Sequence, residues 1–185
     1  MYNLYDFDKT IYDGDSSVDF FLYTLVKKWS TVKYIPKDLI AIIKYKSKKI
    51  PKEEMKETFF SFLKEIDDLD AHVKSFWDKH DKKIKKWYLL NDHSKDIIIS
   101  ASPSFLIEPI GKILKVKDVI ATEVNKTSGD FISKNCYGKE KVKRLHDKYP
   151  NIKINNAYSD SMSDLPMLEL AKNKFIVKKN KIKTI

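Results

Sequence analysis

The sequence contains one cysteine, one arginine and no long apolar run, and these shortages exclude several classes of protein. Cys136 has no possible intramolecular disulfide partner among the 185 residues, which fits a reducing interior. No stretch approaches the ~18 to 20 uncharged apolar residues that a membrane-spanning helix needs. Met1 leads directly into a short segment with acids, so we expect no secretory leader. Together these features predict a soluble, cytoplasmic protein without a membrane span.

The shortage of arginine also bears on the net charge of +10. A strongly basic chain can bind nucleic acid or an anionic membrane. However, Arg144 is the only arginine, and nucleic-acid readers depend heavily on arginine because its planar fork matches phosphates and bases. The lysines are spread along the chain, so we expect no nucleic-acid partner. With 42% hydrophobic residues, the chain can build one core, or one domain with a smaller insert.

Two carboxylates follow the first apolar run of the chain. The run covers residues 2–5, and Asp6 and Asp8 come directly after it. A short apolar run that ends in acids is typical of a buried strand, and ligands bind at the carboxyl ends of strands in open α/β sheets. Alternation along the strand places both acids on the same side. Because two like charges repel, the pair favours a site where a cation lies between them.

From residue 17 to about 90, the apolar residues recur at helical spacing. The first helix is expected to begin at a serine N-cap, either Ser16 or Ser17. The second covers about residues 35–50, with an apolar stripe that includes Leu39, Ile42 and Ile43. Lysine-rich faces of these helices are expected to be solvated, with a membrane-surface role for the second helix as a secondary possibility.

Strands and helices alternate again after residue 96. Strands are expected at 97–99, within 116–124, at 152–158 and at 175–177, and helices from Pro103, over 138–149 and over 161–172. This alternation predicts a parallel sheet covered by helices. We therefore expect an α/β core, residues 1–14 and 91–185, with an all-helical cap, residues 15–90, inserted after the first strand.

Polar groups follow two further strands. Ser100 follows the strand at 97–99, where Ser102 as N-cap and Pro103 at the first helical position predict a helix start with free amides for an anion. Asp160 follows the strand at 152–158 and is not needed for capping, whereas Asp164 is spaced from Ser161 like a capping pair. With Asp6 and the carbonyl of Asp8, Asp160 could complete an oxygen site for Mg²⁺.

A lysine-rich helix start at residues 138–145 supplies a cation for a phosphate. By spacing we prefer Lys141, with Lys139 as the alternative.

These pieces, in this order, resemble the haloacid dehalogenase superfamily. The resemblance rests on D-x-D-x-T at residues 6–10, a serine after the second strand, a lysine opening a helix and a late aspartate cluster. The segment at residues 159–166 and the position of the helical insert resemble the phosphoserine-phosphatase-like branch, and the resemblance covers the whole chain. It implies a Rossmann-like core and a phosphatase that acts through an aspartyl-phosphate.

The resemblance also implies individual roles. Asp6 would be the nucleophile, Asp8 the general acid and then the base, and Thr10 would orient Asp8. A phosphate monoester repels an anionic nucleophile, so a cation is needed to cancel charge as the transition state forms.

The remaining roles concern the phosphate and the metal. Ser100, Ala101 and Lys141 would hold the phosphoryl oxygens. Asp160 would bind Mg²⁺ together with Asp6 and the main-chain carbonyl of Asp8, and Asp164 would support the cluster.

The chain departs from that branch where the substrate is recognised. Asp15 stands about where phosphoserine phosphatases have a glutamate for the substrate ammonium, and it could equally be a turn or N-cap acid. Residues 17–90 contain no arginine to bind a substrate carboxylate. We expect a small phosphorylated metabolite as substrate, and whether phosphoserine is accepted without a cap arginine is left open. The alternatives are a phosphotransferase of the same fold, or a basic protein that binds nucleic acid or an anionic surface with an idle site. The oligomeric state is left open.

Overall fold

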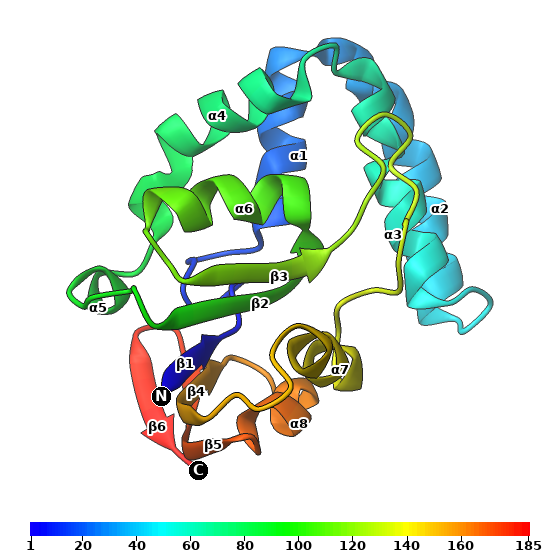
Figure 1. Ribbon diagram of the computed structural model, residues 1–185. Coiled ribbons are helices and arrows are strands. Elements are labelled where there is room, and N and C mark those ends of the chain that lie inside the picture. Colours follow the sequence, from blue (N-terminus) through cyan, green and yellow to red (C-terminus); the bar gives the residue numbers. More distant parts are fainter.

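One six-stranded sheet forms the centre of the computed structural model, which describes residues 1–185 (Figure 1). The strand order is β3-β2-β1-β4-β5-β6. The strands are β1 (Tyr2–Tyr5), β2 (Asp96–Pro103), β3 (Asp118–Thr122), β4 (Ile154–Ser159), β5 (Ala171–Lys178) and β6 (Lys181–Thr184). The first five are parallel, and β6 returns antiparallel to β5. The predicted α/β fold with a mainly parallel sheet is confirmed, although β6 was not predicted, because its residues are all exposed and carry no burial pattern.

The register brings three strand ends to one edge of the sheet. Tyr5 pairs with Ile98 on β2 and with Tyr158 on β4, so β1 lies between them. Asp6 follows Tyr5 directly, Ser100 comes two residues after Ile98, and Asp160 comes two residues after Tyr158. Ligands bind at such an edge where neighbouring strands connect in opposite directions, and β1 occupies that position here.

The segment between β1 and β2 is helical throughout, as the periodicity predicts. It contains α1 (Ser16–Lys27), η1 (Trp29–Tyr34), α2 (Ile35–Lys46), α3 (Lys52–Phe60), η2 (Ser61–Glu65), α4 (Leu69–His80), η3 (Asp81–Lys83) and α5 (Lys86–Leu89), where η marks a 3₁₀ helix. Aromatic residues of this segment, including Phe20, Phe62 and Trp77, share one buried cluster with Phe7 and with Leu106 of α6 (Ser104–Ile113). The division into core and cap stays a prediction, since this apolar cluster crosses the proposed boundary.

Two helices begin at other residues, or with other caps, than the sequence predicts. Helix α6 begins at Ser104, so Pro103 takes the N-cap position and Ser102 is free for another role. Helix α1 is capped by Asp15, whose Oδ1 accepts from the Val18 amide at 3.1 Å, and not by a serine.

The predicted helix over 161–172 is also too long. It is limited to η4 (Met162–Asp164) and α8 (Leu165–Leu168). Strand β5 begins already at Ala171, because its backbone pairs with Ile154 of β4. Tertiary pairing thus overrides the local helical pattern. Helix α7 (Lys139–Lys148) agrees with the prediction within a residue.

Helix α2 is oriented opposite to what its apolar stripe suggests. Leu39, Ile42 and Ile43 face solvent, whereas the buried positions of the helix are Asp38 and Ala41. Both carboxylate oxygens of Asp38 lack a hydrogen-bond partner. Burial raises the pKa of Asp38 to about 7, and the nearby charge of Lys37 opposes the shift only in part.

Replacing this buried acid should stabilise the protein at neutral pH. Between about pH 4 and pH 7 the folded state keeps a proton on Asp38 that the unfolded chain releases, so stability falls as pH rises through this window. We expect Asp38→Asn to raise the free energy of unfolding by about 1–3 kcal/mol near pH 8 and by little near pH 4. Thermal melts at both pH values measure this. Asp130→Asn, which removes an exposed acid without an ion pair, should change neither melt, and equal effects of Asp38→Asn at both pH values would contradict the explanation.

Candidate active site

A cavity of about 490 Å³ opens at the carboxyl edge of β1. The predicted site residues that line it are Asp6, Asp8, Asp15, Ala101, Lys141, Asp160 and Asp164. Thr10 and Ser100 are fully buried behind the lining, and Lys139 is exposed outside it. The structure thus gathers residues from the two ends of the chain and from its middle around one space, while the helical segment supplies the opposite wall.

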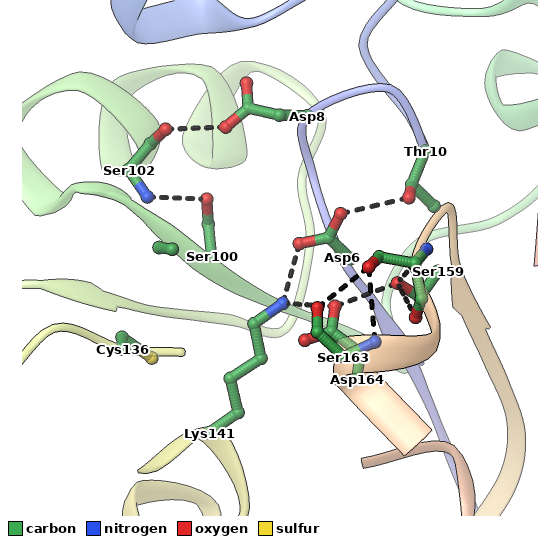
Figure 2. A network of polar contacts seen from close by, with 12 residues as sticks. Asp6, Asp8, Thr10, Ser100, Ser102, Cys136, Lys141, Ser159, Ser163 and Asp164 are labelled. Carbon is green, nitrogen blue, oxygen red and sulfur yellow. Dashed lines mark hydrogen bonds and ion pairs between the residues drawn. The ribbon is translucent and has the colours of Figure 1, made fainter. Parts of the chain in front are cut away.

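Asp6 is held from two sides (Figure 2). Lys141 Nζ lies 2.7 Å from its Oδ1, and the Thr10 hydroxyl donates to its Oδ2 at 3.0 Å. Thr10 was predicted to orient Asp8, and this is wrong, because the turn after β1 brings the threonine back over Asp6. The carboxylate is therefore fixed in orientation at the floor of the cavity.

Asp8 has its own, separate anchors. Its Oδ1 accepts from the Ser16 amide at 2.6 Å and its Oδ2 accepts from the Ser102 hydroxyl at 2.6 Å. The Ser102 hydroxyl was predicted to cap a helix; instead it crosses to Asp8, while the Ser102 amide donates to Ser100 Oγ at 3.1 Å. The start of α1 and the end of β2 therefore position Asp8 together. Sequence analysis missed Ser16 and Ser102 in this role because the contact between Ser102 and Asp8 spans 94 residues.

Burial disfavours the charged form of both Asp6 and Asp8. Burial raises the pKa of Asp6 to about 7, with Lys141 opposing the shift. Burial also raises the pKa of Asp8, and the charge of Asp15 adds to the shift. A raised pKa keeps a carboxyl group protonated closer to neutrality, which is what a general acid requires.

Lys141 joins the N-terminal and C-terminal acids. It is 1% exposed, and its Nζ lies 2.7 Å from both Asp6 Oδ1 and Asp164 Oδ2. Burial by itself lowers the pKa of Lys141, but the two carboxylates outweigh burial and the net shift is upward. Gly138, at a φ of +56°, makes the tight turn from which α7 directs Lys141 inward. Between the two candidate lysines, only Lys141 contacts the site.

Asp164 serves the site more than the helix start. Its Oδ2 accepts from Lys141 and, at 2.8 Å, from the Ser159 hydroxyl, whereas its buried Oδ1 has no partner. The predicted capping pair is therefore only half right: Ser161 Oγ accepts from the Ser163 amide, but the carboxylate of Asp164 is turned toward the lysine.

The oxygen atoms of the site fit a hard cation such as Mg²⁺. No group of three or more His, Cys, Asp or Glu side chains is arranged to hold a metal alone. Mg²⁺, however, usually keeps several waters and takes only one or two carboxylates. Asp160 lines the cavity and its carboxylate accepts no hydrogen bond, and the main-chain carbonyl of Asp8 accepts none either. With Asp6, these are the oxygens that would hold the ion, and the unpartnered Oδ1 of Asp164 lies in the same cluster.

Lys56 of α3 is a cavity residue that sequence analysis did not single out. Its Nζ donates to the Ala101 carbonyl at 2.8 Å and to Asn135 Oδ1 at 3.1 Å, and it has no carboxylate partner. Burial lowers the pKa of Lys56 to about 8, with the charge of Lys52 adding to the shift. In the sequence it is one lysine among many on lysine-rich helices, so no local signal distinguishes it. Asp15 both caps α1 and lines the cavity, so both interpretations of it remain open.

Comparison with known proteins agrees with this fold. The family model of haloacid dehalogenase-like hydrolases matches residues 4–169. The chain therefore belongs to the haloacid dehalogenase-like hydrolase family, and the predicted membership is confirmed. The solved structures described below are similar to it in fold.

Individual relatives are more distant. The protein CicA of Caulobacter vibrioides is 31% identical over 87 residues, which cover 44% of this chain and 39% of CicA, so the match spans well under half of either protein. A protein of unknown function from Bordetella pertussis Tohama I has a TM-score of 0.78 at 18% identity, over 94% of this chain and 87% of that one. A phosphoserine phosphatase in the form of a phospho-aspartyl intermediate analogue has a TM-score of 0.55 at 16% identity, over 93% and 83%. At these identities the solved structures show the fold alone.

Proposed function

We propose that this hydrolase is a Mg²⁺-dependent phosphatase that cleaves a phosphomonoester through an aspartyl-phosphate on Asp6. The observation that carries the proposal is the pair of separately anchored carboxylates: Asp6 is held by Lys141 and Thr10, and Asp8 by Ser16 and Ser102. A nucleophile and an acid need different orientations, and the two sets of anchors provide them.

In the first half of the reaction, an Asp6 carboxylate oxygen attacks phosphorus. The bond between phosphorus and the leaving oxygen breaks, and Asp8 gives its proton to that oxygen so that a neutral alcohol departs. Lys141 neutralises charge on the phosphoryl oxygens, and Ala101 lines the same cavity with Ser100 buried behind it. Asp6, Asp160 and the Asp8 carbonyl would hold Mg²⁺, which would contribute further positive charge near the phosphoryl group.

In the second half, Asp8 accepts a proton from water. The water oxygen attacks phosphorus, the bond to Asp6 breaks, and inorganic phosphate leaves with both carboxyl groups restored to their starting states. Asp8 can serve in both halves because it is protonated at the end of each cycle and its anchors hold it in one place.

Chelation should silence the enzyme reversibly. With a generic aryl phosphate as substrate, we expect EDTA to abolish turnover and added Mg²⁺ to restore it, because the buried acids around Lys141 exceed the charge that one lysine can balance. Phosphate release measures the activity, and circular dichroism checks that the chelated protein stays folded. Full activity after exhaustive chelation would show that the reaction needs no metal.

A further inference from the structure

Helix α1 carries a row of exposed apolar residues that no part of the chain covers. The row is Val18, Leu22, Val26 and, at the start of η1, Trp29. Spacings of four place Val18, Leu22 and Val26 on one face of α1, and Trp29 follows just after the helix ends at Lys27. Val26 is 86% exposed and Trp29 is 80% exposed. Isolated exposed apolar residues are ordinary, but a continuous row of them indicates a contact surface.

Helix α2 adds a second apolar surface. Its exposed residues include Leu39, Ile40, Ile42 and Ile43. The helix lies at the outer edge of the molecule, away from the sheet (Figure 1). Since it buries Asp38 in place of these side chains, packing against the rest of the chain does not account for its apolar face. We call the exposed apolar residues of α1, η1 and α2 the apolar patch.

The segment that carries most of the patch is rich in positive charge. Residues 20–52 contain nine lysines and one acid, the buried Asp38. Seven of these lysines have no ion pair within the protein, namely Lys27, Lys37, Lys44, Lys46, Lys48, Lys49 and Lys52. An apolar face bordered by lysines is the pattern of a helix that lies in the interface of an anionic bilayer. A second copy of the chain would bring like charges together, and nucleic acid would leave the apolar side chains without a partner.

The apolar patch reaches the mouth of the active-site cavity. Val18 and Ile42 belong to the patch and also line the cavity. Met55 and Phe59 continue the apolar lining inward, and Lys52 and Lys56 lie on the same wall. Along one path the protein therefore offers an apolar surface, two cations and then the catalytic acids. This order matches a lipid whose acyl part meets the apolar patch and whose anionic phosphomonoester headgroup passes the two lysines to reach the acids.

We propose that the apolar patch docks on an anionic bilayer and that the substrate is the phosphomonoester headgroup of a membrane lipid. The substrate part of this inference rests on the proposed phosphatase function; the docking part does not. Docking through a helix face needs no membrane-spanning segment, and no helix of the protein is long and apolar enough to be one.

The docking is tested by sedimentation of the full chain with phosphatidylcholine vesicles, with and without phosphatidylglycerol. We expect binding only to the anionic vesicles, weakened by salt, with a blue shift of Trp29 fluorescence that Trp29→Phe removes. The double variant Ile40→Gln/Ile43→Gln should bind at least about ten-fold more weakly. Leu90→Gln changes a side chain that is more exposed than either isoleucine and lies next to α5, across the molecule from α2 (Figure 1), and this variant should bind like the unmodified chain.

Either absence of binding to anionic vesicles or unchanged binding by the double variant would overturn the docking. A concentration-dependent dimer that the double variant abolishes, without vesicle binding, would assign the patch to a second copy instead.

The substrate class is tested on the same proteins with two substrates, an aryl phosphate in solution and phosphatidic acid in vesicles. The double variant should keep aryl phosphate hydrolysis, because neither isoleucine lines the cavity, and should lose at least about ten-fold on phosphatidic acid at low vesicle concentration. Hydrolysis of the aryl phosphate but not of phosphatidic acid would overturn the lipid substrate and leave the phosphatase proposal intact. Hydrolysis of neither would reject the phosphatase proposal, while vesicle binding would still decide the docking.

Discussion

Asp6→Asn should abolish turnover while the protein stays folded. The amide keeps the shape of the carboxylate but cannot form the acyl phosphate, so we expect phosphate release to fall by roughly 10⁴-fold or more. The fold should survive because Lys141 keeps Asp164 as its partner. Steady-state hydrolysis of an aryl phosphate measures the loss, and a quenched reaction with labelled substrate should show a phosphorylated enzyme only for the unmodified chain.

Asp13→Asn is the matched control for this substitution. Asp13 is an exposed acid in the same loop and does not line the cavity, so its amide variant should retain normal turnover. Near-normal activity of Asp6→Asn would rule out the covalent mechanism, whatever the metal dependence shows.

Lys141→Met should cost both stability and activity. The substitution leaves Asp6 and Asp164 buried without the cation that both contact at 2.7 Å. Removal of one partner from a buried ionic network typically costs about 3–5 kcal/mol, because the remaining charges are desolvated and unpaired. Chemical denaturation near neutral pH should show a loss of that size, and aryl phosphate hydrolysis should fall together with it.

The double variant Lys141→Met/Asp164→Asn separates the two effects. Removing one of the stranded carboxylates should recover part of the stability, because the network then holds one uncompensated charge in place of two. It should not recover activity, since the phosphoryl group still lacks its lysine. Lys139→Met, on the exposed lysine two residues earlier, should be nearly neutral in both measurements. A Lys141→Met protein of unchanged stability would contradict the buried network.

The strand ends that carry the site residues, and the helical insert, could be predicted from the sequence because each has a local pattern. A short apolar run followed by Asp6 and Asp8 predicts a strand end, and the isoleucines at 97–99 predict another. The helical period over 17–90 is also local. These patterns led to the α/β fold, the helical insert and the family, which the structure and the family match confirm.

Hydrogen-bond partners could not be predicted in the same way. Thr10 has two acids among the four residues before it, and only the path of the turn decides that it reaches Asp6. Ser102 is a good helix cap by its neighbours, yet it binds Asp8 from 94 residues away. The burial of Lys56 likewise depends on how α3 packs against the end of β2, which no pattern within α3 encodes.

The sequence by itself determined where strands and helices form and which acids end the strands, because periodicity and chain neighbours are enough to set local structure. Only the tertiary structure decided that Lys141 lies between Asp6 and Asp164, 135 and 23 residues away, and that α2 turns its isoleucines outward. The physical reason is the same in both cases. Burial and charge compensation depend on what surrounds a side chain in space, and those surroundings come from parts of the chain that are far apart in sequence.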